Sequence, residues 1–151
     1  MKQCHSIKVS VFVKPEEDEK KIFSALNKLI NSEAETEKDK TIMIERKAEG
    51  FNQRTITIYE AIIKKENQVN KFIKRILKSL NEQQKELLKK NAHTRIDDEL
   101  FFCLRLDKQK LAEENIISVI EAGECYYIKM KLACYPKNKD AALKVIKEIF
   151  K

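Results

Sequence analysis

The sequence has no tryptophan and only 2 glycines, 2 prolines and 2 histidines among its 151 residues. Two glycines cannot build the glycine-rich loops that cradle phosphate in P-loop or Rossmann sites, and neither motif is present. No apolar run approaches the ~20 residues needed to cross a bilayer, and residues 1–6 show no signal-peptide pattern. We therefore expect a cytoplasmic protein without a membrane partner.

Metal sites and catalytic motifs are also missing. The four cysteines are Cys4, Cys103, Cys125 and Cys134, and no pair has CxxC spacing. His5 follows Cys4 directly, but a structural zinc site needs four converging ligands, so we expect neither a metal nor another cofactor. Paired carboxylates occur only where turns and helix starts explain them, and GxSxG is absent, so we do not expect an enzyme. A metal-dependent nucleolytic or modifying enzyme is the alternative.

What the sequence has in abundance is charge. Charged residues make up 36% of the chain, against roughly 25% in typical soluble domains. Lysine and arginine number 31 against 24 acids, which gives a formal net charge of +7. This excess favours polyanionic partners such as nucleic acids. A surface rich in lysine and glutamate is also typical of thermophile proteins, so charge alone does not decide between these interpretations.

The hydrophobic pattern predicts interleaved strands and helices. Apolar alternation predicts strands, and helical spacing predicts helices, over the following ranges: strands 5–14, 41–47, 54–63, 95–106 and 125–135; helices 15–30, 66–80, 111–115 and 138–150. Residues 83–91 either extend the second helix or form a basic connector. This order predicts an α+β fold with a mostly antiparallel sheet and helices packed on one face, as a single domain over residues 1–151.

Helix starts carry recognisable polar residues. The acidic run Glu16–Glu19 suits the first turn of a helix, where the helix dipole favours negative charge. A metal or catalytic cluster is the competing interpretation of the same run. Asp107 is placed to be the N-cap of the short helix, and Asn138 that of the last one.

The last predicted strand, residues 125–135, is the most informative stretch. One side carries apolar residues that can pack on a core, while the other carries Tyr127, Lys129, Lys131 and Tyr135. Aromatic rings beside cations can hold unpaired bases by stacking and phosphates by charge. The plainer interpretation is a half-exposed strand whose tyrosines cover neighbours and whose lysines maintain solubility.

The other predicted strands also have one apolar side. If helices cover the apolar sides, the opposite sides display Lys8, Phe12, Lys14, Thr55, Thr57, Tyr59, Phe101 and Arg105. In strands 41–47 and 54–63, the alternation predicts that five isoleucines face the core: Ile42, Ile44, Ile56, Ile58 and Ile62. An open sheet of aromatics and cations is typical of RNA-recognition surfaces, and it can equally be a dimer interface.

Three short segments resemble a family of small archaeal proteins described as predicted RNA-binding proteins or predicted exosome subunits. Residues 11–22 are similar to its opening strand, which ends in Phe before a helix start of the Pro-Glu-Asp type. Residues 50–52 resemble its glycine turn, with Gln53 where a second glycine or its neighbour is expected. Residues 104–109 resemble its Arg-x-Asp-Lys-Gln run at a strand-to-helix junction.

This resemblance implies a fold similar to a 5S-rRNA-binding ribosomal protein and, loosely, to double-stranded-RNA-binding domains. It implies RNA binding in RNA processing or turnover, with exosome or ribosome-related proteins as partners. The resemblance and the residue pattern together predict a non-catalytic RNA-binding protein whose contacts are Lys8, Phe12, Lys14, Arg105, Lys108, Tyr127, Lys129, Lys131 and Tyr135. The alternative is a protein-interaction module or homodimeric adaptor that uses the same sheet face.

Overall fold

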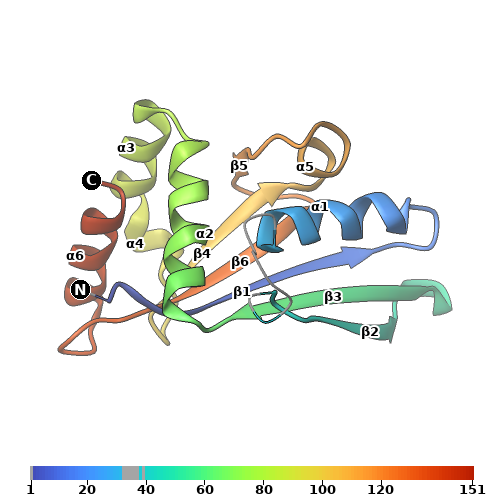
Figure 1. Cartoon of the computed structure of the whole chain (residues 1–151), viewed down its shortest axis with the longest axis horizontal. Coiled ribbons are helices and arrows are strands. Elements are labelled where there is room, and N and C mark those ends of the chain that lie inside the picture. The colour runs from blue at the N-terminus through green and yellow to red at the C-terminus, as the bar shows by residue number, and fades with distance from the viewer. Residues whose placement is uncertain (1, 32–37, 39) are drawn as a thin grey trace. The chain divides into compact units, whose positions relative to one another are not determined.

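The computed structural model describes residues 2–31, 38 and 40–151. Within them, one sheet has the strand order β2-β3-β1-β6-β4-β5, and its antiparallel pairing together with the helices confirms the predicted α+β class (Figure 1). The strands are β1 (Cys4–Val13), β2 (Met43–Glu49), β3 (Thr55–Ile63), β4 (Phe101–Asp107), β5 (Val119–Ile120) and β6 (Cys125–Leu132). The helices are α1 (Glu19–Asn31), η2 (Phe51–Gln53), α2 (Glu66–Lys78), α3 (Glu82–Lys90), α4 (Ala92–Arg95), α5 (Lys108–Glu114) and α6 (Lys139–Ile149).

The chain divides into two compact units, and strands β1, β3, β4 and β6 contribute residues to both. The first unit comprises Met1–Ile7, Ile63–Leu104 and Lys129–Lys151. The second comprises Lys8–Ile62 and Arg105–Ile128. That residues 1–151 form a single domain stays a prediction.

The core of the second unit lies between α1 and the strands. Helix α1 buries Ile22, Leu26 and Leu29, whose spacing places them on one side of the helix. The Tyr126 side chain of β6 is fully buried, and its hydroxyl donates a hydrogen bond to the Ile22 carbonyl at 2.9 Å. Because a buried phenol needs a polar partner, this bond fixes α1 against the even-numbered side of β6.

The first unit has its own core beneath α2 and α6. The aromatic rings of Phe102 and Phe150 lie 5.8 Å apart in a tilted arrangement. Phe72 of α2 and Met130 of β6 are also buried, and both line the same small apolar cavity. Helices therefore meet the even-numbered side of β6 in this unit as well, which leaves the odd-numbered side uncovered by them.

The predicted orientation of β3 is wrong by one residue. Thr57 and Tyr59, expected to face outward, are buried, whereas Ile62, expected to face the core, is 38% exposed. The Tyr59 hydroxyl donates to Glu19 of α1 at 2.6 Å, and the Tyr59 ring packs 5.0 Å from Phe23. Because strand side chains alternate, docking Tyr59 on α1 turns the even-numbered residues to the other side.

The prediction for β2 is also wrong. Ile42 and Ile44, expected in the core, are 82% and 47% exposed. Strand β2 lies at one edge of the sheet, and in the described part of the chain it is paired only with β3, in the register Met43↔Ala61 to Glu49↔Thr55. An edge strand of this kind has less of its surface covered than a central one, so apolar alternation is a weaker guide to its orientation.

The turn between β2 and β3 has the geometry that a glycine turn requires. A Cβ atom added to Gly50 would lie 2.6 Å from Ile56 Cδ1, so a larger residue there would require the end of the Ile56 side chain to move. Gln53 has a φ of 60°, in the left-handed region that glycine enters most readily. Gln53, which departs from the family pattern, thus adopts the backbone conformation that a second glycine would adopt most readily.

Helix starts follow the sequence closely. Asp107 accepts from the Lys110 N–H at 3.0 Å and Asn138 from the Ala141 N–H at 2.8 Å, which confirms both predicted N-caps. Residues 82–90 form a separate helix, α3, because Asn81 and Gln84 bond reciprocally as a capping box.

Candidate nucleic-acid interface

In the second unit, several predicted contact residues lie on strand sides that α1 does not cover. We call this the open side and define it by Lys8, Phe12, Arg105 and Tyr127. The intervening residues, such as Val11 and Leu106, are buried. Phe12 is 57% exposed, an unusual position for a large apolar ring and one that leaves it available to stack.

Arg105 and Tyr127 form a stacked pair on neighbouring strands β4 and β6. The guanidinium carbon of Arg105 lies 5.1 Å from the centre of the Tyr127 ring, within cation–π range. A cation–π contact of this kind leaves the guanidinium N–H groups able to donate hydrogen bonds to phosphate oxygens. The sequence predicted both residues, but not that each holds the other in place.

Lys8 is partly neutralised by an acid, Glu60, for which the sequence pattern gave no prediction. Its ammonium lies 3.5 Å from Glu60 of β3, and Arg46 of β2 bonds the other oxygen of the same carboxylate. Burial opposes ionisation of Glu60, but the hydrogen bond and charge of Arg46 and the charge of Lys8 outweigh it and hold the pKa of Glu60 below its ordinary value. Two cations and one anion leave this group with a net positive charge.

Lys108 is the prediction that the structure corrects. Its side chain is 7% exposed, and its ammonium donates to the Phe12 carbonyl at 2.5 Å and to Glu17 at 2.7 Å. A phosphate contact would cost Lys108 both of these partly buried bonds, so we leave it out of the interface that we propose. Lys14 bonds Glu124 but remains 44% exposed, so it can exchange this acid for a phosphate.

The acidic run at the start of α1 has partners of its own. Asp18 accepts from the Lys21 N–H at 3.2 Å, as expected of a helix start. Glu16 bonds Arg54, Glu17 bonds Lys108, and Glu19 accepts from a tyrosine hydroxyl. These carboxylates therefore tie α1 to neighbouring segments. Among the described residues, no group of three or more His, Cys, Asp or Glu side chains could hold a metal ion.

The first unit carries a separate group of predicted contacts. The Lys129 ammonium lies 4.6 Å from the centre of the Phe101 ring and 3.8 Å from Asp97. Lys131, two residues further along β6, is exposed, and Tyr135 is 94% exposed. Phe101, Lys129 and Lys131 form what we call the first-unit patch.

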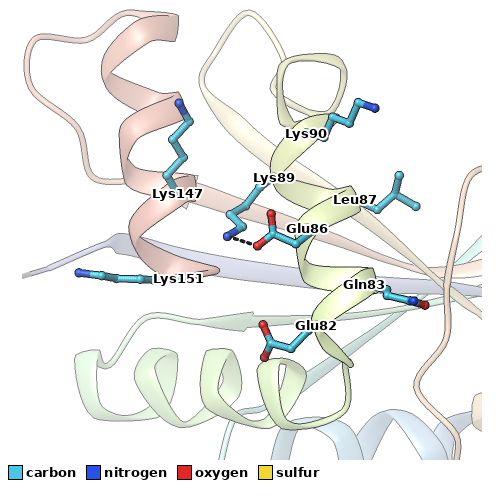
Figure 2. Close-up of a pocket in the computed structure, with 8 residues that line it drawn as sticks. All are labelled: Glu82, Gln83, Glu86, Leu87, Lys89, Lys90, Lys147 and Lys151. Atoms are coloured by element: carbon cyan, nitrogen blue, oxygen red, sulfur yellow. Dashed lines mark ion pairs between the residues drawn. The ribbon is translucent and has the colours of Figure 1, made fainter.

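A large groove between α3 and α6, also in the first unit, lies outside the predicted residues. It has a volume of about 940 Å³, and Figure 2 shows Lys147 on α6 and Lys151, just beyond the end of α6, opposite Glu82 and Glu86 on α3. Lys89 pairs with Glu86 at 2.6 Å. Two glutamates offset part of the charge of the four lysines that line the groove, so it offers a polyanion less net attraction than its lysines suggest.

Two of the four cysteines, Cys4 and Cys125, do not have the properties of reactive thiols. Burial raises the pKa of Cys4 to about 12, and it also raises the pKa of Cys125. A thiol is nucleophilic as the thiolate, so both are poor nucleophiles at neutral pH. No helix in the described residues is long and apolar enough to cross a membrane.

Comparison with known proteins gives the fold and the family. A family model described as RNA binding matches residues 6–133. An RNA-binding protein of Pyrococcus abyssi is 27% identical over 146 residues, covering 97% of this chain and 93% of the relative. An uncharacterised protein of Methanocaldococcus jannaschii is 28% identical over 145 residues, covering 94% of each.

Solved structures show the same architecture. A protein of Archaeoglobus fulgidus has a TM-score of 0.82 and 25% identity, covering 97% of this chain and 99% of its own. A DUF54 protein of Methanothermobacter thermautotrophicus has a TM-score of 0.79 and 23% identity, covering 99% of both chains. The family match extends over most of the sequence, including the strands that carry the open side. The chain therefore belongs to this RNA-binding family.

Proposed function

We propose that this protein binds RNA without catalysing a reaction, through the open side of its second unit and the first-unit patch. The observation that carries the proposal is the Arg105–Tyr127 stack, with the exposed Phe12 ring on the next strand. These residues offer aromatic faces to bases and guanidinium N–H groups to phosphates, which is the combination that single-stranded RNA requires. Family membership and the name of the Pyrococcus relative support the same function.

The charges of the interface fit moderate, salt-sensitive binding. The net charge of +7 attracts a polyanion over distance. Lys8, Lys14 and Lys129 each lie near a carboxylate, so part of their attraction is offset in the free protein. Lys131 and Arg105 have no ion pair recorded in the described residues, and we assign them the strongest phosphate contacts.

A salt series with charge variants tests the proposal. Lys129→Ala combined with Lys131→Ala should weaken RNA binding and reduce the slope of log K against log salt by about 1.4 for single strands, because two phosphate contacts are lost. A matched control removes two exposed lysines from α2, Lys71→Ala with Lys74→Ala, and should change the slope less. Equal effects in both pairs would show that binding follows net charge and not this patch.

The biological setting is a finer part of the proposal. The sequence resemblance supports a cytoplasmic role in RNA processing or turnover, in association with exosome or ribosome-related proteins. Affinity purification of the tagged chain from its native cells, before and after nuclease treatment, tests this. Exosome subunits retained after nuclease would support direct association, whereas their loss would reduce the proposal to RNA binding alone.

The exposed Phe12 ring also favours a second candidate, a homodimer or adaptor that buries the open side against protein. This candidate predicts a dimer in solution by light scattering, and a Phe12→Ser variant that becomes monomeric. A wild-type monomer that forms a complex with RNA would rule out the dimer.

A further inference from the structure

The first unit contains a groove that the proposed contacts do not yet explain. It has a volume of about 630 Å³ and lies between the start of β1, the segment after β6 and one side of α6. Figure 1 shows the beginning of β1 close to α6. The groove is within the roughly 300–1,000 Å³ typical of small-ligand sites. Small and apolar residues, Ala133, Ala141 and Val145, leave room for a flat ligand.

Tyr135 lines this groove, and its ring is almost entirely in water. The side chain is 94% exposed, more than any other large hydrophobic or aromatic residue in the described part of the chain. Pro136 follows it and fixes its own backbone φ, which restricts the backbone around Tyr135. A ring held at the rim of a groove offers a stacking surface at low entropic cost.

Basic groups gather near the same groove. His5 and Lys144 line it, and the positive charges of Lys2, Lys131 and Lys137, which do not line the groove, also act on His5. Partial burial and these three positive charges lower the pKa of His5. Several cations crowded together repel one another, and an anion placed among them relieves that repulsion. A phosphate group has the charge and the acceptor oxygens for this place.

The opposite wall of the groove has a different chemistry. Asp140 and Glu148 of α6 line it, together with Lys144. Carboxylates repel phosphate, but they accept hydrogen bonds from the exocyclic amino groups of bases. The cations near His5 therefore suit a phosphate, and the wall of α6 suits a base.

We propose that this groove binds one unpaired nucleotide of an RNA strand, with the base stacked on Tyr135 and its phosphate beside His5. This rests on the proposed function and specifies its substrate, because a base in a duplex is paired and stacked and cannot enter the groove. The protein therefore prefers single-stranded RNA, or a duplex with an unpaired end, to a blunt duplex. Bases that carry an amino group bind better than uracil.

The first experiment compares wild type, Tyr135→Ala and Tyr135→Phe in binding to single-stranded and blunt duplex RNA. Tyr135→Ala should weaken single-strand binding by about five- to a hundredfold, the usual contribution of one base–aromatic stack, with little effect on the duplex. Tyr135→Phe keeps the ring and should bind as wild type does. Because the side chain is exposed, neither substitution should disturb folding, which circular dichroism checks.

The second experiment titrates wild type with cytidine monophosphate, uridine monophosphate and inorganic phosphate, observed by NMR. Cytidine monophosphate should shift the His5 and Tyr135 ring signals together and raise the pKa of His5, whereas inorganic phosphate should move His5 alone. Uridine monophosphate should bind more weakly. Nucleotide shifts that leave both rings unchanged would overturn the groove assignment.

The two proposals fail in distinguishable ways. If wild type binds RNA and Tyr135→Ala binds single strands equally well, the groove inference is overturned and the proposed function stands. If wild type binds no RNA at low salt, the proposed function fails and the groove inference fails with it. Equal affinity for single strands and blunt duplex would likewise contradict the groove inference alone.

Discussion

Lys108→Met should destabilise the protein without weakening RNA binding. The Lys108 side chain is 7% exposed, and its ammonium holds both Glu17 and the Phe12 carbonyl. Methionine retains most of the apolar stem but leaves a carboxylate and a carbonyl without their donor. The contact joins α5 to the start of α1 and the end of β1, so its loss acts on a junction of three segments.

The expected loss of stability can be worked out from the burial of the Lys108–Glu17 ion pair. Removing one partner of a buried ion pair costs about 3–5 kcal/mol. Glu17 is 23% exposed, and water can partly replace its lost donor, so we expect about 2–4 kcal/mol. For a chain of this length, each kcal/mol lowers Tm by about 2–4 °C. Lys108→Met should therefore melt about 5–15 °C below wild type.

Urea denaturation and calorimetry provide the measurement. Lys108→Met with Glu17→Gln should recover part of the loss, since the unpaired charge is then gone, and the coupling reports the pair itself. The exposed pair Lys21–Glu113 is a matched control, and Lys21→Met should change Tm little. A Lys108→Met protein with unchanged Tm, or one that is fully stable but has lost RNA affinity, would refute this reasoning and return Lys108 to the interface.

Three further predictions concern stability. Tyr126→Phe removes the hydrogen bond to the Ile22 carbonyl and should lower the free energy of unfolding by about 1 kcal/mol in urea; an unchanged value would mean that water replaces the bond. Glu60→Gln should destabilise at pH 7, and the difference from wild type should shrink as pH falls below about 4.3, the ordinary pKa of glutamate, because a carboxylate whose pKa is depressed on folding stabilises only while ionised; a difference that is constant with pH would contradict this. Gln53→Gly should raise the free energy of unfolding by about 0.5 kcal/mol. Glycine removes the strain of the left-handed φ at residue 53, and the larger conformational entropy of glycine in the unfolded chain offsets part of that gain.

Local signals in the sequence predicted the fold class and most element positions. The N-caps Asp107 and Asn138 act within four residues of themselves, so their side-chain chemistry is readable from sequence. Apolar and polar residues alternate along β1 and β6, because one side of each strand is buried and the other is not. This pattern can be recognised from neighbouring residues alone. Such features need no knowledge of distant contacts.

The predictions were wrong where contacts between segments distant in the sequence determine whether a residue is buried. Tyr59 is buried because Glu19, 40 residues away, accepts its hydroxyl hydrogen bond, and a rule that treats tyrosine as a surface residue misses this. Lys108 is held by Glu17, 91 residues away, so its position in a family-like motif gave no sign that it is buried. The Arg105–Tyr127 stack needed the pairing of β4 and β6 before it could be recognised.

Ultraviolet cross-linking of bound single-stranded RNA, followed by mass spectrometry of the cross-linked peptides, tests the central claim most directly. Cross-links form where bases lie against aromatic side chains. The account predicts that they map to peptides containing Phe12, Tyr127 and Tyr135, and that Tyr135→Ala removes the last of these. Cross-links confined to α2, or to the groove between α3 and α6, would show that RNA binds elsewhere and would contradict the account.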